Sequence, residues 1–220
     1  MFSWLKADRG NKDGSSHFSK DAALRSLRYV VLDTELTSLD KSTNRLLSIG
    51  AITMEGPRIQ VGQQFYRLVN PGVPVPAKSV LVHTLRSEDV QAGEPLPMVL
   101  AEFCQFIQGA VLVGHFLGVD LRALRKELGG SGRELNNPAV DTARIHHWIL
   151  RRGPYSEDLP VRMEKLDLPT VVKAYGLERL DAHHALYDAF LTACAWQRMM
   201  PLVEERGIRK LGQLLRIARA

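Results

Sequence analysis

The sequence has little cysteine and no long apolar run, and both shortages exclude classes of protein. Only Cys104 and Cys194 occur among the 220 residues, each inside an apolar helical pattern, so they fit neither a disulfide framework nor a zinc site. Because such cysteines are typical of a reducing compartment, we expect a cytoplasmic protein. No stretch approaches the roughly 18 apolar residues of a membrane span, and the opening MFSWLKADRGNKDG lacks a secretory apolar region. We therefore expect neither export nor a membrane partner.

Acidic residues are fewer than basic ones, which bears on the partner. The chain has 29 Lys and Arg against 24 Asp and Glu, a net charge of +5, and a pI near 9.4. This balance favours an acidic partner, with nucleic acid the first candidate and an anionic membrane the second. The composition is otherwise that of an ordinary globular protein with one sizeable core.

The chain divides into two parts of different pattern. Residues 1–27 mix charged, small and a few large apolar residues without a sustained period, which predicts a poorly ordered arm with a short helix near 20–27. Residues 28–220 carry helix and strand patterns throughout and predict a single domain that ends in a basic helix. No internal repeat or low-complexity segment interrupts them.

The stretch from Tyr29 to Leu36, YVVLDTEL, predicts a buried strand that ends in acidic residues. Its apolar first half is typical of a strand covered on both faces. Asp33 and Glu35 project to the same side because a strand repeats every two residues. Two buried carboxylates in register require cations, and divalent metals are the natural candidates. The alternative is a strand that has ended, with both acids on a solvated turn.

The remaining patterns predict an α/β fold. Strands are expected at 46–54, where Gly50 leaves room for a close backbone approach, and at 59–69, so that the first three strands form a meander. Shorter strands follow at 110–114 and 136–142. Helices are expected at 95–108, 119–128, 143–151, 168–175, 182–200 and 208–218, with Asp167 as a cap and Pro201 breaking or kinking the longest one.

Two further acids occupy notable positions. Asp120 lies in the first turn of a helix, where a carboxylate is favoured by the helix dipole, and Asp188 lies four residues after His184. Each has an ordinary structural explanation on its own. Ligands, however, collect outside the carboxyl ends of strands in α/β sheets, and Asp33, Glu35 and Asp120 all follow an apolar strand.

Three segments in order resemble the motifs of the DEDDh (DnaQ-like) 3′ to 5′ exonucleases. They are VVLDTELTSLD, LVGHFLGVD and HHALYDAFLTA, supported by VHTLRSEDV and PAVDT, and the resemblance covers about residues 28–207. It implies a ribonuclease H-like fold: a central mixed β-sheet, with an antiparallel meander first and parallel strands after it, and helices on both faces.

The resemblance also implies roles for individual residues. Two Mg²⁺ or Mn²⁺ ions would stabilise the attacking and leaving oxygens of a phosphodiester. Asp33 would bridge both ions, Glu35 and Asp188 would hold the ion nearer the attacking water, and Asp120 would support the second. His183 would be the general base, with His184 as the helical partner of Asp188. The product would be a nucleoside 5′-monophosphate.

Departures from the family pattern concern how substrate is held. Leu36 and Ser38 replace a threonine and a glycine of the first motif, and Phe116 and Val119 replace an asparagine and a phenylalanine of the second. None removes a metal ligand. We expect Thr34, Leu36 and Phe116 to contact the terminal nucleotide.

The expected substrate is the 3′ end of a nucleic acid. Single-stranded DNA, as in proofreading or repair, is favoured; trimming of RNA 3′ ends is the alternative, and a non-catalytic or polymerase-associated binding module is the competing class. A polymerase is a candidate partner, and the residues indicate no particular oligomeric state. Basic residues that could contact the strand are Arg122, Arg125, Lys126, Arg144, Arg151, Arg152, Arg206, Arg209 and Lys210.

Overall fold

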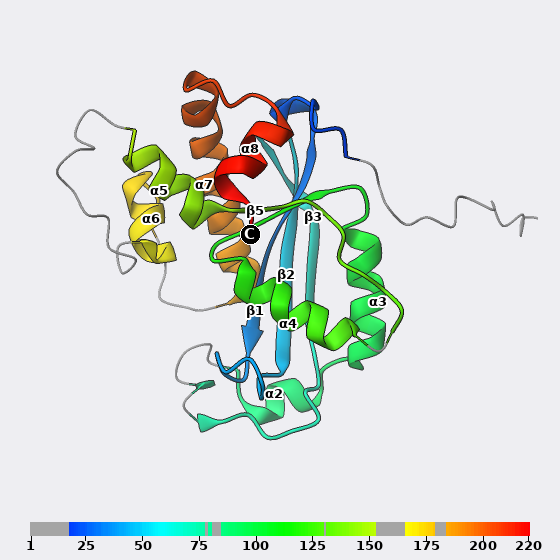
Figure 1. The fold of residues 1–220 in the computed structure, drawn as a ribbon. Coiled ribbons are helices and arrows are strands. Elements are labelled where there is room, and N and C mark those ends of the chain that lie inside the picture. Colours follow the sequence, from blue (N-terminus) through cyan, green and yellow to red (C-terminus); the bar gives the residue numbers. More distant parts are fainter. Residues whose placement is uncertain (1–17, 78, 81–84, 130, 153–165, 179–183) are drawn as a thin grey trace, which may run out of the picture.

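A five-stranded mixed sheet forms the centre of the molecule. The computed structural model describes residues 18–77, 79–80, 85–129, 131–152, 166–178 and 184–220. The strand order is β3-β2-β1-β4-β5 (Figure 1). Strands β1 (Arg28–Leu36), β2 (Leu46–Glu55) and β3 (Arg58–Leu68) form the antiparallel meander, and β4 (Val111–Gly114) and β5 (Ala139–Asp141) extend the sheet in parallel with β1. The predicted mixed sheet is confirmed.

Helices cover both faces of this sheet, as predicted. Figure 1 shows α5, α6, α7 and α8 on one side of the sheet and α3 on the other. The helices are α2 (Ser87–Gln91), α3 (Leu96–Phe106), α4 (Gly118–Leu128), α5 (Thr142–Leu150), α6 (Leu168–Ala174), α7 (Ala185–Glu205) and α8 (Leu211–Ala218). Most boundaries agree with the sequence prediction to within three residues, and the Asp167 side chain caps α6 by accepting a hydrogen bond from the Thr170 N–H at 2.8 Å.

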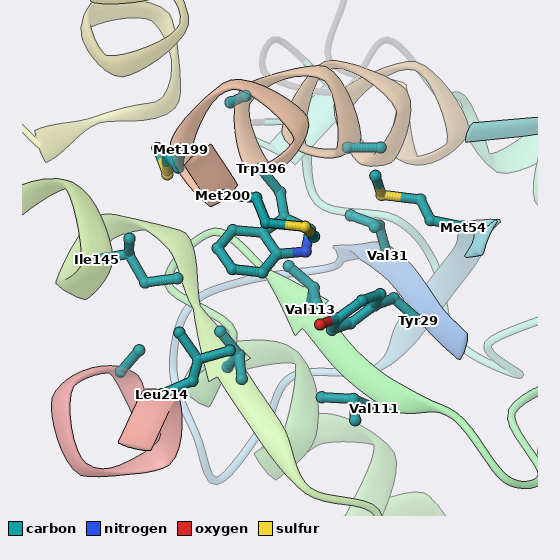
Figure 2. Close-up of a cluster of buried hydrophobic side chains, with 14 of the residues drawn as sticks. Tyr29, Val31, Met54, Val111, Val113, Ile145, Trp196, Met199, Met200 and Leu214 are labelled. Atoms are coloured by element: carbon teal, nitrogen blue, oxygen red, sulfur yellow. The ribbon is translucent and has the colours of Figure 1, made fainter. Parts of the chain in front are cut away.

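Alternate residues of β1 belong to different apolar clusters. Tyr29 and Val31 pack toward α7, whereas Val30 and Leu32 pack toward α3 and α4. Figure 2 shows the first cluster, in which Trp196 meets the Tyr29 ring edge-on with centroids 5.8 Å apart. Because the alternation continues along the strand, Asp33 and Glu35 face α7 and Thr34 faces α4.

The short helix expected near 20–27 is present as a single turn that packs on the sheet domain. A 3₁₀ turn, η1 (Leu24–Ser26), packs Leu24 into the core with no exposed surface. Arg25 pairs with Glu204, and the Leu24 N–H donates to the Arg209 carbonyl oxygen. The sequence pattern did not predict the burial of Leu24, because a single turn is too short to show an apolar period. Residues 1–17 lie outside the described ones.

Helix α7 continues past Pro201 to Glu205, so the break that was one of the two outcomes predicted for this proline does not occur. Proline removes one helical hydrogen bond. Met199, Met200 and Val203 are nonetheless fully buried on both sides of it, and their burial holds the last turn in place. The basic helix α8 starts three residues later than predicted and packs Leu211, Leu214 and Ala218 against the same cluster. Within the described residues, no helix combines the length and apolar character needed to cross a bilayer.

Candidate active site

Asp188, which is distant in sequence, meets two acids of one strand, Asp33 and Glu35, at the end of β1. One carboxylate oxygen from each of Asp33, Glu35 and Asp188 lies within 4.8 Å of the other two. Glu35 and Asp188 are buried, and Asp33 is half-buried. Carboxylates this close repel one another unless a cation lies between them. A set of hard oxygen donors fits Mg²⁺ or Mn²⁺, so the residues suit the expected ions.

The start of α7 reaches these acids because β2 has a glycine opposite Asp33. Asp33, Gly50 and Tyr66 are register partners in one row across β1, β2 and β3. With no side chain at Gly50, the backbone of Ala185 and Leu186 lies directly on the sheet. Asp188 then follows one helical turn later, beside Asp33. The predicted close backbone approach at Gly50 is confirmed.

His184 is the N-terminal cap residue of α7, and its ring stacks on Tyr66. The ring centroids are 4.5 Å apart and the interplanar angle is 24°. His183, the expected general base, lies outside the described residues.

Asp120 approaches the same place from the other side of the sheet. It is buried in the first turn of α4, and its Oδ1 accepts hydrogen bonds from the Thr34 N–H at 2.9 Å and the Thr34 hydroxyl at 2.6 Å. Burial raises the pKa of Asp120 above its usual range, and the Thr34 hydrogen bonds oppose this rise. A bound cation would favour the ionised form.

One cavity of about 970 Å³ joins the four acids. Its wall includes Asp33, Glu35, Asp120 and Asp188, together with Thr34 and Phe116. Leu36, the third expected substrate residue, instead lies in the apolar cluster below α4 with 8% of its surface exposed. Leu39 occupies the cavity wall in its place and is 82% exposed. The leucine in the cavity wall is thus Leu39, three positions after the one expected.

Asp141 is a fifth acid in the cavity wall that the sequence analysis did not select. Its Oδ1 accepts hydrogen bonds from the backbone N–H groups of Ala143 at 2.9 Å and Phe116 at 3.2 Å. Burial raises its pKa. Asp141 ends β5 beside β4, so the rule that ligands collect at carboxyl strand ends would have identified it.

The segment after β4 is held in an unusual backbone conformation. Phe116 has φ of +52°, the only positive φ of a non-glycine residue in the described parts of the chain. Its neighbour His115 is buried, pairs with Thr142 Oγ1 and the Leu166 carbonyl, and packs its ring edge against Phe116. These contacts make His115 a packing residue that holds the segment after β4.

Comparisons with known proteins agree with this geometry. Residues 30–195 match the model of a family described as Exonuclease (RNase_T). The chain is 30% identical over 197 residues to a DNA polymerase III subunit epsilon-like protein of Rhodobacter capsulatus, covering 89% of this chain and 27% of that protein. It is 26% identical over 166 residues to the DNA polymerase III subunit epsilon of Aquifex aeolicus, covering 75% of this chain and 76% of that protein.

Solved structures share the fold. E. coli Exonuclease I in complex with a dT13 oligonucleotide superimposes with a TM-score of 0.68 at 16% identity, over 81% of this chain and 43% of that one. Exonuclease X in complex with 5′ overhanging duplex DNA superimposes with a TM-score of 0.63 at 20% identity, over 86% of this chain and 98% of that one. The chain is also 28% identical over 199 residues, 90% of its own length, to a PolC-type DNA polymerase III of Thermotoga maritima. It spans only part of these longer relatives, 27% of the Rhodobacter protein and 14% of the Thermotoga protein.

Proposed function

The chain belongs to this exonuclease family, and on that premise we propose that it is a metal-dependent 3′ to 5′ exonuclease that releases nucleoside 5′-monophosphates. The convergence of Asp33, Glu35 and Asp188, with Asp120 in the same cavity, carries the proposal. A module that only binds nucleic acid has no use for a carboxylate cluster that repels phosphate.

The acids would hold two divalent ions, which when bound supply positive charge for the attacking and leaving oxygens of the phosphodiester. Asp33 would contact both, Glu35 and Asp188 one, and Asp120 the other. Thr34 fixes the Asp120 carboxylate through two hydrogen bonds to one oxygen and leaves the second oxygen to bind the ion. His183, next to the residue that caps α7, would accept the proton from the attacking water.

Leu39 and Phe116 would hold the terminal nucleotide. Both lie in the cavity wall, and apolar and aromatic surfaces bind nucleobases without reading their sequence. Single-stranded DNA is the favoured substrate because similar proteins are named as polymerase III epsilon subunits and a similar structure holds dT13. Those names also make a DNA polymerase the favoured protein partner.

A single assay tests the proposal. The purified protein is incubated with 5′-labelled single-stranded DNA or RNA in Mg²⁺, Mn²⁺ or chelator. We expect stepwise shortening from the 3′ end that chelator abolishes, and a loss of more than roughly 10³-fold in Asp188→Asn because a ligand of the ion is removed. Glu205→Gln, an exposed acid at the far end of the same helix, is the matched control and should retain full activity.

The competing functions give different results in the same assay. Binding of the strand without cleavage in either metal would show a non-catalytic module, and faster shortening of RNA than of DNA would indicate RNA trimming.

A further inference from the structure

A second cavity continues from the candidate active site along α5. It has a volume of about 630 Å³, and its described lining is Arg144, His147, Trp148, Arg151, Arg152 and Ile217. Arg144 and His147 also line the active-site cavity, so the two hollows share a wall. Among the described residues this lining contains three arginines and no acid. We call it the α5 groove.

The basic side chains of the groove form a row that leads away from the acids. Arg144, His147 and Arg151 are spaced three and four residues apart, which places them on one side of α5. A rise of 1.5 Å per residue makes this row about 10 Å long, more than the spacing of neighbouring phosphates along a strand. Arg144 and Arg151 are exposed and available to a ligand.

Trp148 orients the last arginine. The Arg152 guanidinium lies over the Trp148 ring at 4.4 Å from its centroid, and the tryptophan itself packs against the apolar cluster beneath α7. This cation–π contact restricts the guanidinium before any ligand binds. A pre-oriented guanidinium loses less freedom when it binds phosphate, and its planar fork matches phosphate oxygens.

Lys126, in the last turn of α4, is engaged differently. Its Nζ donates to the carbonyl oxygens of Ser42 and Asn44, at 3.1 and 2.8 Å, and so ties down the loop between β1 and β2. The ammonium group of Lys126 therefore already binds the protein's own backbone. The exposed arginines of the α5 groove remain available to a ligand.

We propose that the α5 groove binds the phosphodiester backbone of a single-stranded nucleic acid on the 5′ side of the nucleotide being removed. The proposal rests on the exonuclease function proposed above. Because the two cavities share a wall, a single strand bound at the acids would continue along the groove to Arg151 and Arg152. The positive charge of the groove is complementary to the phosphates of that strand.

The test compares a substrate that reaches the groove with one that does not. The short substrate is 4-nitrophenyl thymidine 5′-phosphate, which has no upstream nucleotide and cannot reach the groove. The long substrates are 12-nucleotide single strands of DNA and of RNA, which can. In Arg151→Glu/Arg152→Glu the ratio of kcat/KM for the 12-mer to that for the ester should fall roughly tenfold, because two phosphate contacts are lost. The matched control, Arg58→Glu/Arg133→Glu, reverses two exposed arginines outside both cavities and should keep the wild-type ratio.

Binding of the same 12-mers, measured by fluorescence anisotropy in Ca²⁺, separates this proposal from the exonuclease function. Affinity should fall in the groove variant and its slope against the logarithm of salt concentration should decrease by about 1.4, since each single-strand phosphate contact contributes about 0.7. Wild-type protein that cleaves neither substrate would refute the exonuclease function but leave this binding test intact. Unchanged 12-mer affinity and ratio in the groove variant, or an equal loss in the control, would refute the groove. The neutral pair Arg151→Gln/Arg152→Gln replaces the reversed pair if circular dichroism shows misfolding.

Discussion

A Cβ atom at Gly50 would fall inside the backbone of Leu186. The sheet and the first turn of α7 thus touch backbone to backbone, and this contact sets the distance between Asp188 on the helix and Asp33 on the strand. The position of one glycine in β2 therefore controls whether the acidic cluster forms.

Gly50→Ala should separate the cluster. The added methyl group would push the start of α7 off the sheet, and a displacement of about 1 Å of Asp188 is enough to reduce turnover roughly 10²-fold. We also expect a stability loss of about 1 to 3 kcal/mol from overpacking. Gly62→Ala is the control, since a Cβ there meets no atom within 4 Å. Steady-state kinetics and urea denaturation measure both effects; full activity in Gly50→Ala would contradict the argument.

Thr34→Val should weaken the hold on Asp120. The variant keeps the backbone N–H bond to Oδ1 but removes the 2.6 Å bond from the hydroxyl. A hydrogen bond to a charged group contributes about 1.5 to 3 kcal/mol, so we expect at least a tenfold drop in kcat and a higher Mn²⁺ requirement. Thr34→Ser retains the hydroxyl and should remain close to wild type. Titrating activity with Mn²⁺ distinguishes them, and equal behaviour of the two variants would remove the role of the hydroxyl.

Acid should destabilise the fold through His115. Burial lowers the pKa of His115 to about 4, whereas the unfolded side chain titrates near 6.5. Between these values the unfolded state binds more protons, so stability is fully present above pH 6.5 and falls as the pH drops toward 4, by up to about 3 kcal/mol.

Urea denaturation at pH 7.5 and 4.5 in chelator measures this loss. His115→Gln removes the titrating group and should lose less stability between the two pH values than wild type, because the carboxylates contribute equally to both proteins. An equal loss would assign the acid sensitivity to other groups.

Phe116→Asn should raise stability and weaken substrate binding. A non-glycine residue in the left-handed region costs about 1 to 2 kcal/mol, and asparagine tolerates it best. The same change removes an aromatic ring from the cavity wall, so KM for single-stranded DNA should rise several-fold. Phe116→Leu keeps the strained backbone and loses only the ring. Phe116→Leu should show the higher KM without the gain in melting temperature. If its melting temperature rose as much as that of Phe116→Asn, the argument from backbone strain would be contradicted.

The sequence by itself determined what depends on local geometry. The two-residue period of β1 placed Asp33 and Glu35 on one side of the strand, and the lengths of the apolar segments located the five strands and the longer helices. Motif order indicated which acids belong together. These properties depend on neighbours within one element, so the chain shows them directly.

Packing between elements decided the rest. Three features depend on partners far away in the sequence. They are the presence of Leu39 and not Leu36 in the cavity wall, the place of Asp141 beside Phe116, and the path of α7 past Pro201. Such contacts carry no local period. Their free energy comes from burial against the sheet and from hydrogen bonds that exist only after the elements meet.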